Sequence, residues 1–124
     1  MTKRPILIVE DEPELGKVLL DNLSQNGYVV HLAESAEKAL RLFNHKVFDL
    51  IISDVRLPDM SGLQLLDNIR NRSFPIPVIL MTGFGSVQNA VEAMKKGAVD
   101  YILKPFSLEV LEQGIENALR QNPP

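Results

Sequence analysis

Charged and hydroxyl side chains stand directly after four short apolar runs of the chain. An acidic triplet, Glu10–Glu12, follows the first run, and Asp54 follows the third. Thr82 and Lys104 stand at the ends of the fourth and fifth runs. Crowded carboxylates repel one another and require a cation, and a site with oxygen donors alone favours Mg²⁺ or Mn²⁺ over zinc. A lysine and a threonine nearby would hold phosphoryl oxygens, and Asp54 is the carboxylate best placed to form an acyl phosphate.

Five apolar runs predict the strands that must position these residues. They are short, and several are rich in β-branched residues and apolar throughout rather than alternating, which is typical of strands covered on both faces of a parallel sheet. The runs are Ile6–Val9, Tyr28–Leu32, Leu50–Ile52, Val78–Met81 and Tyr101–Leu103.

The stretches between and after these runs predict five amphipathic helices. Pro13 suits the first turn of a helix that ends at Gly27, Ser35 and Ser107 are placed to cap the second and fifth helices, and Gly97 closes the fourth. The apolar positions at helical spacing are Leu15, Val18, Leu19, Leu23, Ala36, Ala39, Leu40, Phe43, Leu63, Leu66, Ile69, Val87, Val91, Met94, Leu108, Leu111, Ile115 and Leu119.

Five βα repeats with short connections predict an α/β fold with right-handed crossovers. We expect a flavodoxin-like (βα)5 domain, a doubly wound parallel five-stranded sheet with the strand order 2-1-3-4-5. Ligands of such sheets bind at the carboxyl ends of the strands, near the point where the strand order reverses. The polar residues that follow the strands should therefore meet at one edge. Gly114 is a weak point in the last helix, because glycine is a poor helix former.

Composition excludes several classes of function. The chain of 124 residues has 16 acidic residues against 13 Lys and Arg, and its net charge of −3 leaves it without the basic surface that grips nucleic acid. It has no cysteine, which excludes a disulfide scaffold and a thiolate zinc site. No segment approaches the roughly 18 apolar residues of a membrane span, and no signal peptide is present. We therefore expect a cytoplasmic domain without membrane partners.

Each site residue also has a plainer interpretation when it is considered alone. An acidic triplet is commonly a helix start, Asp54 a turn residue, Thr82 a strand end and Lys104 a surface lysine. Their joint placement at the strand ends favours the phosphoryl site. Gly83-Phe84-Gly85 fails as a dinucleotide fingerprint, because position 88 is Gln. The remaining polar residues are assigned to turns, solvent or structural positions, namely Asp49, Asp59, Asp100, His31 and His45.

Four motifs resemble the receiver domain of two-component response regulators, over the chain from Ile6 to about Arg120. They are Val9-Glu10-Asp11-Glu12, Ser53-Asp54-Val55-Arg56-Leu57-Pro58, Met81-Thr82-Gly83 and Lys104-Pro105-Phe106. The resemblance implies that Asp54 accepts a phosphoryl group from a phosphohistidine of a sensor histidine kinase. It implies a switch that catalyses its own phosphorylation and dephosphorylation, and not a turnover enzyme.

The resemblance also implies the ligands of the metal ion. Glu10 and Asp11 would form the acidic pocket, with Asp11 as a direct Mg²⁺ ligand. Asp54 and the backbone carbonyl of Arg56 would supply the other protein ligands.

Further positions carry the switch in the family. Thr82 and Lys104 would contact the phosphoryl oxygens, and Tyr101 would turn inward as Thr82 moves. Pro105 would follow a cis peptide bond, which is plausible because cis bonds are almost confined to X-Pro. Phosphorylation would repack the face of helix four, strand five and helix five, which would form a homodimer or contact a downstream domain.

The segments Met81–Val87 and Ala90–Ala98 resemble nitrogen-regulatory-type regulators in particular. Those place a receiver ahead of an AAA+ ATPase that activates sigma-54 RNA polymerase, followed by a DNA-binding domain. We expect residues 1–120 to form the receiver and residues 121–124 to begin a linker, so that any DNA contact comes through an output domain outside this chain. Arg56 and Phe84 offer no amide or carboxylate to position a hydrolytic water, which predicts slow self-dephosphorylation.

Two other functions compete with the receiver as interpretations of the same residues. A magnesium-dependent aspartyl-phosphate phosphohydrolase typically carries an Asp-x-Asp motif on its first strand, whereas this chain has Glu10-Asp11-Glu12 and no room for a substrate-covering cap. A flavodoxin-like cofactor binder needs a hydroxyl-rich phosphate loop after its first strand, where the three acids of this chain would repel an anion.

Overall fold

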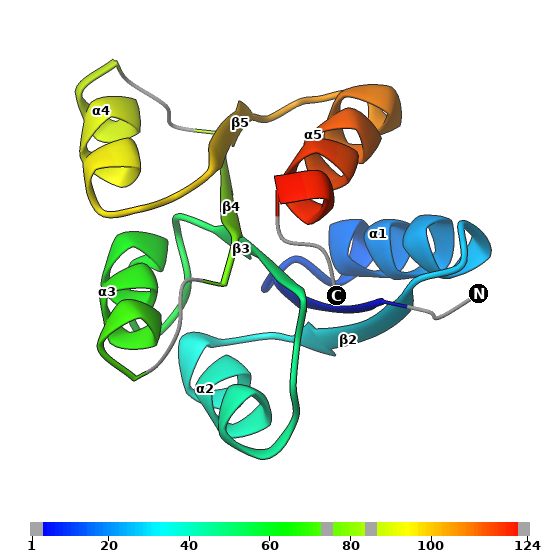
Figure 1. Ribbon diagram of the computed structural model, residues 1–124, viewed down its shortest axis with the longest axis horizontal. Coiled ribbons are helices and arrows are strands. Elements are labelled where there is room, and N and C mark those ends of the chain that lie inside the picture. Colours follow the sequence, from blue (N-terminus) through cyan, green and yellow to red (C-terminus); the bar gives the residue numbers. More distant parts are fainter. Residues whose placement is uncertain (1–3, 73–75, 84–86, 122–124) are drawn as a thin grey trace.

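Five parallel strands form the middle layer of the molecule in the predicted order β2-β1-β3-β4-β5 (Figure 1). The computed structural model describes residues 4–72, 76–83 and 87–121. The strands are β1 (Pro5–Val9), β2 (Val29–Ala33), β3 (Leu50–Asp54), β4 (Val78–Thr82) and β5 (Asp100–Leu103). The flavodoxin-like fold is thereby confirmed.

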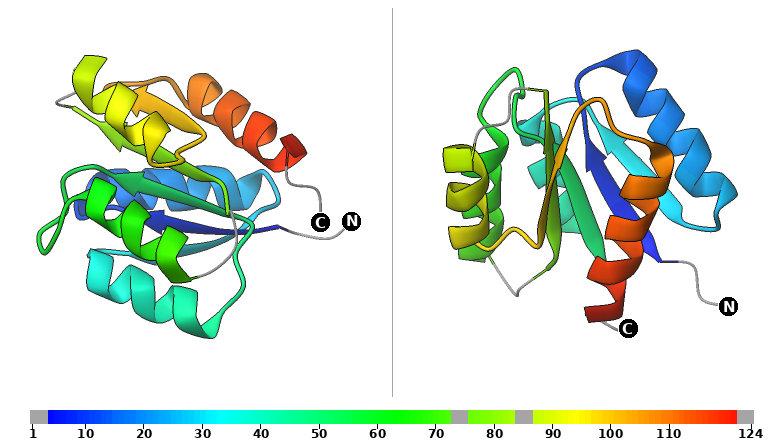
Figure 2. Two further views of the ribbon diagram at one scale, coloured as in Figure 1. Left: turned by 60° about the vertical axis from the view of Figure 1, so that its left-hand side comes forward. Right: turned by 90° about the horizontal axis from the view of Figure 1, so that it is seen from above.

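Helices cover both faces of the sheet. They are α1 (Pro13–Gln25), α2 (Ala36–His45), α3 (Gly62–Arg72), α4 (Val87–Lys95) and α5 (Leu108–Gln121). Figure 2 shows α1 and α5 together on one face and the other three helices on the opposite face. Among the described residues, no helix is long and apolar enough to cross a membrane.

The residues predicted to begin and end the helices do so in the structure. The Ser35 hydroxyl accepts a hydrogen bond of 3.2 Å from the Lys38 N–H in the first turn of α2, and Ser107 caps α5 in the same way. Gly27 and Gly97 follow α1 and α4 with φ angles of +95° and +101°, a conformation in which a side chain would be strained. Ser107 thereby ends the connection after β5, which carries Lys104.

The three inner strands are buried on both faces, and their side chains alternate between two separate apolar clusters. Leu7, Val9 and Ile51 point toward α2, α3 and α4, whereas Ile8 and Ile52 point toward α1 and α5. Burial on both faces explains why these runs are apolar throughout rather than alternating.

Among the described side chains, three apolar positions that the helical pattern predicts to face inward are exposed, and that of Val87 lies outside the description. Val18 on α1 is 50% exposed, and Val91 and Met94 on α4 are 47% and 50% exposed. Ala93 is instead the α4 residue that reaches the core. The second strand begins at Val29 rather than Tyr28 and is partly exposed, because it lies at the edge of the sheet.

Gly114 lies where α5 packs closely against the sheet. A Cβ atom at this position would stand 3.2 Å from the Asp100 Oδ2 atom, a tight contact. The glycine that weakens the helix pattern therefore permits the close approach of α5 to β5.

Candidate functional site

The predicted site residues meet at the carboxyl edge of the sheet. Asp54 and Thr82 are the last residues of β3 and β4, and Glu10 and Lys104 directly follow β1 and β5. Backbone hydrogen bonds continue the sheet through these positions, from the Glu10 N–H to the Ala33 carbonyl at 2.9 Å and from the Lys104 N–H to the Thr82 carbonyl at 2.8 Å. The sheet itself therefore sets the positions of the side chains.

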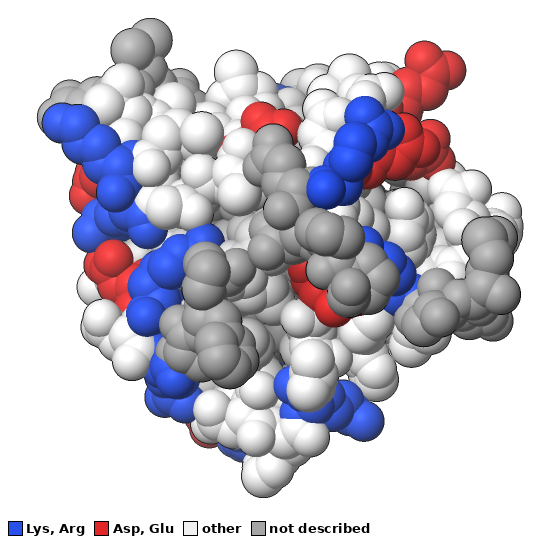
Figure 3. Space-filling model, in the orientation of Figure 1, with Lys and Arg blue, Asp and Glu red and all other residues white. Residues whose placement is uncertain are grey.

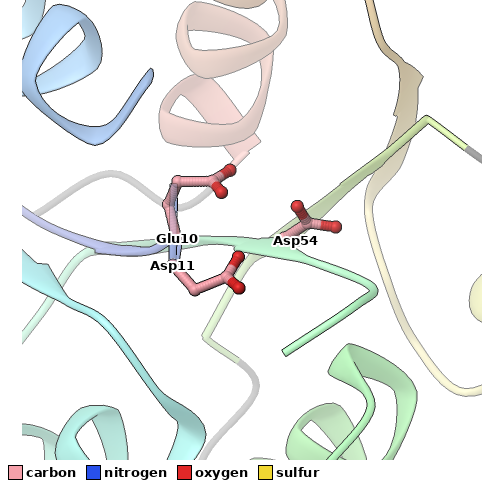
Figure 4. Close-up of side chains that lie close together, drawn as sticks. All are labelled: Glu10, Asp11 and Asp54. Carbon is pink, nitrogen blue, oxygen red and sulfur yellow. The ribbon is translucent and has the colours of Figure 1, made fainter. Parts of the chain in front are cut away.

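Three carboxylates converge on one space at this edge (Figure 4). One oxygen from each of Glu10, Asp11 and Asp54 lies within 4.8 Å of the others. Glu10 and Asp54 are 2% and 7% exposed, whereas Asp11 is exposed. Such a set of oxygen donors on two adjacent strand ends fits a hard divalent cation such as Mg²⁺. Glu12 contributes its backbone instead, since its N–H donates to Glu10 Oε2 at 3.0 Å.

Lys104 spans the two buried carboxylates. Its Nζ atom lies 2.9 Å from Glu10 Oε1 and 2.6 Å from Asp54 Oδ2. Burial opposes the charged form of Lys104, but the hydrogen bonds to Asp54 and Glu10 outweigh it and raise the pKa of Lys104 above its ordinary value. Burial also raises the pKa of Glu10, against the lowering effect of Lys104. The lysine thus offsets part of the negative charge of the cluster.

The loop between β3 and α3 forms one wall of the site. The Arg56 N–H donates to Asp54 Oδ1 at 2.9 Å, and Arg56 pairs with Ser61 in an isolated β-bridge. The Gly62 N–H donates to the Val55 carbonyl at 2.7 Å. A Cβ atom on Gly62 would collide with the backbone carbonyl oxygen of Asp54, so only glycine allows α3 to begin this close to the site.

An open cavity of about 380 Å³ lies over these groups. Its lining consists of Glu10, Asp11, Glu12, Asp54, Arg56, Gly83 and Lys104. The volume and the mixture of acids with one lysine leave room for a hydrated cation and a small anionic group side by side.

The residues expected to carry the switch lie on the two neighbouring strands β4 and β5. Thr82 is 1% exposed at the end of β4. Tyr101 is half-buried against the cluster under α3 and α4, its hydroxyl has no hydrogen-bond partner within the described ranges, and burial raises its pKa. The peptide bond between Lys104 and Pro105 is cis. Phe84 and residues 122–124 of the expected linker lie outside the described residues.

Two acids assigned to turns and solvent have structural partners that the sequence did not indicate. The Asp59 carboxylate accepts hydrogen bonds from the backbone of α2, at Ala36 and Glu37. Asp49 forms an ion pair with Arg4 at 2.7 Å. His31 is structural as expected, with its ring edge-on to Phe48 at 5.6 Å. Backbone donors far along the chain leave no trace in a local sequence pattern, so the partners of Asp59 cannot be predicted from it.

Sequence comparison finds a family model described as the response regulator receiver domain, which matches residues 6–116. The response regulator protein FleR of Pseudomonas aeruginosa is 46% identical over 86% of this chain, and the transcriptional regulatory protein GlrR of Escherichia coli is 39% identical over all of it. The chain spans about a quarter of the length of these relatives, 22% and 28% respectively.

Solved structures agree over nearly the whole chain. The crystal structure described as FixJ-N is 40% identical with a TM-score of 0.89, covering 100% of this chain and 99% of that one. The non-phosphorylated HemR receiver domain of Leptospira biflexa is 32% identical with a TM-score of 0.92, covering 98% of each chain. The family model, the relatives and these structures together show that the chain belongs to the receiver domains of two-component response regulators.

Proposed function

We propose that this receiver is a phosphorylation-controlled switch in which Asp54 accepts a phosphoryl group from a phosphohistidine of a sensor histidine kinase. The observation that carries the proposal is the pairing of Lys104 with Asp54 and Glu10 beside a third carboxylate, Asp11, in an open cavity. Carboxylates for a cation, a nucleophilic carboxylate and a lysine for an anion are the parts that phosphoryl transfer to aspartate needs.

The metal ligands in this proposal are the carboxylates of Glu10, Asp11 and Asp54 and the backbone carbonyl of Arg56, with Asp11 bound directly. The grouping of three carboxylate oxygens within 4.8 Å supports a divalent cation there. A bound Mg²⁺ or Mn²⁺ would neutralise the cluster and the incoming phosphoryl oxygens. The Arg56 N–H keeps one oxygen of Asp54 oriented, at 2.9 Å.

In the transfer step, a carboxylate oxygen of Asp54 attacks the phosphorus atom. A phosphorus–oxygen bond forms, the phosphorus–nitrogen bond to the donor imidazole breaks, and its electron pair stays on the imidazole nitrogen. Lys104 then exchanges its contact with Asp54 for a phosphoryl oxygen, and the Thr82 hydroxyl binds another. Because Lys104 already lies 2.6 Å from Asp54, it needs only a small displacement.

The face formed by α4, β5 and α5 would transmit the phosphorylation signal to a partner. Tyr101 would turn into the space behind Thr82, and the lack of a hydrogen-bond partner for its hydroxyl among the described residues supports such a movement. The same three elements expose the apolar side chains Val91, Leu103 and Val110, and Figure 3 shows a mostly uncharged surface over β5. We assign this face to a homodimer or to contact with an output domain.

The output domain in this proposal is a sigma-54-dependent transcription activator, which would supply the contact with DNA. The motifs of the nitrogen-regulatory type and the relatives named transcriptional regulatory proteins support it. Self-dephosphorylation would be slow, and the exchange with the kinase would take place in the cytoplasm.

The test is the intact mass of the chain after incubation with acetyl phosphate and Mg²⁺. The wild type should gain a single adduct of about 80 Da, the elementary mass of one phosphoryl group. When Mg²⁺ is chelated before the incubation, no adduct should form. Asp54→Asn should gain none, because an amide is not a nucleophile. Asp49→Asn, which removes a carboxylate at the opposite end of β3, is the matched control and should be modified like the wild type. Absence of an adduct on a folded wild type that binds Mg²⁺ would contradict the proposal.

A further inference from the structure

We propose that Asp59 is a positioning residue for the metal site, which holds the loop carrying the Arg56 carbonyl against the N-terminus of α2. The inference rests on the function proposed above for that site. Asp59 Oδ1 accepts the Ala36 N–H at 3.0 Å, and Asp59 Oδ2 accepts the Glu37 N–H at 2.8 Å. Asp59 lies 22 residues beyond Glu37 in the chain, so the contact joins two separate connections of the fold.

The N-terminus of α2 is a strong partner for this carboxylate. The first N–H groups of a helix have no acceptor within the helix, and they carry a partial positive charge. Ser35 accepts the Lys38 N–H, and Asp59 accepts the two donors before it. Burial opposes the charged form of Asp59, but backbone hydrogen bonds, those from Glu37 and Ala36 foremost, together outweigh it and hold the pKa of Asp59 below its ordinary value. The carboxylate is thus charged when it binds, which strengthens both hydrogen bonds.

The loop that Asp59 holds is otherwise anchored at its two ends. The Arg56 N–H binds Asp54 at the beginning, and Arg56 pairs with Ser61 across the loop. At the other end the Ser61 N–H donates to Gln64 Oε1 at 3.0 Å, and Gln64 returns a hydrogen bond to Ser61 at 3.1 Å. Asp59 stands between these anchors and ties the loop to a second helix.

The hydrogen bonds of Asp59 to α2 also connect the two sides of the carboxylate cluster. The loop before α2 begins at Ala33, whose carbonyl accepts the Glu10 N–H at 2.9 Å. The loop after β3 begins beside Asp54 and contains the Arg56 carbonyl. Asp59 thereby links the backbone that positions Glu10 with the backbone that positions Arg56. Residues that orient ligands from outside the coordination shell typically contribute a factor of about 10 to 100 to metal affinity.

The test is the Mg²⁺ dissociation constant of the 124-residue chain, measured by calorimetry for the wild type, Asp59→Ala and Asp59→Asn. We expect the constant of Asp59→Ala to rise about tenfold. Asp59→Asn should show a smaller rise, because its amide oxygen accepts one of the two N–H groups and its NH₂ group cannot accept the other. The Arg56 amide resonance should shift in both variants before any metal is added.

Two control variants separate positioning of the loop from the loss of a helix cap and from the loss of a negative charge. Ser35→Ala removes the other cap of α2 without touching the loop, and Glu37→Gln removes a negative charge at the same helix end while the backbone N–H remains. Both should bind Mg²⁺ within twofold of the wild type.

An unchanged constant for Asp59→Ala would overturn the inference, and so would an equal rise in Ser35→Ala or Glu37→Gln. If the wild type binds no Mg²⁺, or binds it equally well after Asp11→Asn, the proposed function of the site fails as well. Failure of the proposed function is thereby distinguished from failure of the inference about Asp59, in which the wild type binds Mg²⁺ at the site and Asp59→Ala binds it equally well.

Discussion

Two buried charges of opposite sign, Glu10 and Lys104, neutralise each other beside Asp54, the proposed phosphoacceptor. The Glu10 side chain is fully buried and that of Lys104 is 19% exposed. An isolated buried carboxylate is costly, and a hydrogen-bonded cation within 3 Å offsets that cost. The chain therefore folds around its acidic cluster with an internal cation, and the same lysine is in place for a phosphoryl group.

The pairing predicts how stability changes at high pH. Because the pKa of Lys104 is raised in the folded chain, its contribution is fully present below the unfolded value of about 10.4 and is lost as the pH rises through the folded value. Lys104→Met should cost about 2 kcal/mol at pH 8 in the presence of a chelator, and less toward pH 11.

Urea unfolding of both proteins between pH 8 and pH 11 measures this difference. Tyr28 and Tyr101, whose pKa values are also raised by burial, affect both proteins alike and cancel in the comparison. A difference in unfolding free energy that stays constant over this range would contradict the prediction.

Single residues are also expected to set the lifetime of the proposed acyl phosphate. Arg56 lines the cavity and offers neither an amide nor a carboxylate to orient a hydrolytic water. We expect a half-life of minutes or more for the phosphorylated domain, and a shortening of about tenfold in Arg56→Asn, within the range of such positioning effects. Loss of the adduct mass with time measures both. A wild-type half-life of seconds would be contrary to this expectation.

At the scale of elements, the start of α3 controls the shape of the site. Gly62 lets the helix begin in contact with the backbone of Asp54 and Val55, where a Cβ atom has no space. Both ends of the loop between β3 and α3, which carries the proposed metal ligand Arg56, consequently depend on one residue without a side chain.

Gly62→Ala should therefore destabilise the chain by about 1–3 kcal/mol and weaken Mg²⁺ binding, because the loop must shift to remove the clash. Gly16→Ala is the matched control, since its Cβ atom would meet only the flexible side chain of Leu32 at 3.1 Å and alanine favours the helix. Urea unfolding and calorimetry measure the two effects. Equal stabilities of the two variants would contradict the role assigned to Gly62.

The sequence was sufficient to predict the strand order and the residues that meet at the sheet edge. Parallel strands bring their carboxyl ends to one edge, so Glu10, Asp54 and Lys104 could be placed together without any knowledge of loops. The contacts of Asp59 could not be predicted, because its partners are backbone N–H groups. The exposure of Met94 also escaped prediction, since periodicity shows which residues share a helix face but not how much of that face is covered.

At the scale of the whole molecule, charge is distributed unevenly over the surface. Lys and Arg side chains follow the side of α3 and α4 in Figure 3, whereas the surface over β5 is mostly uncharged. Leu103 on β5 and Val110 on α5 are 56% and 53% exposed there. An apolar surface with few charges is suited to contact with another protein.

We expect phosphorylation to convert the monomer to a dimer through this surface. Val110→Lys should prevent the change, because dimerisation would bury its charge without a partner. Val47→Lys is the control, since Val47 is 84% exposed between α2 and β3, outside the proposed face. Light scattering after incubation with acetyl phosphate and Mg²⁺ gives the mass of each. A phosphorylated Val110→Lys dimer would exclude this face.

Within the described ranges, the two apolar clusters on opposite faces of the sheet share strands but no side chains. A substitution in one cluster changes the packing of neighbours on its own side, so the changes that compensate for it are found on that side as well. Over evolutionary time the two faces can therefore diverge at separate rates. A lineage can remodel the helices of one layer to suit a new partner while the opposite layer continues to serve an old one.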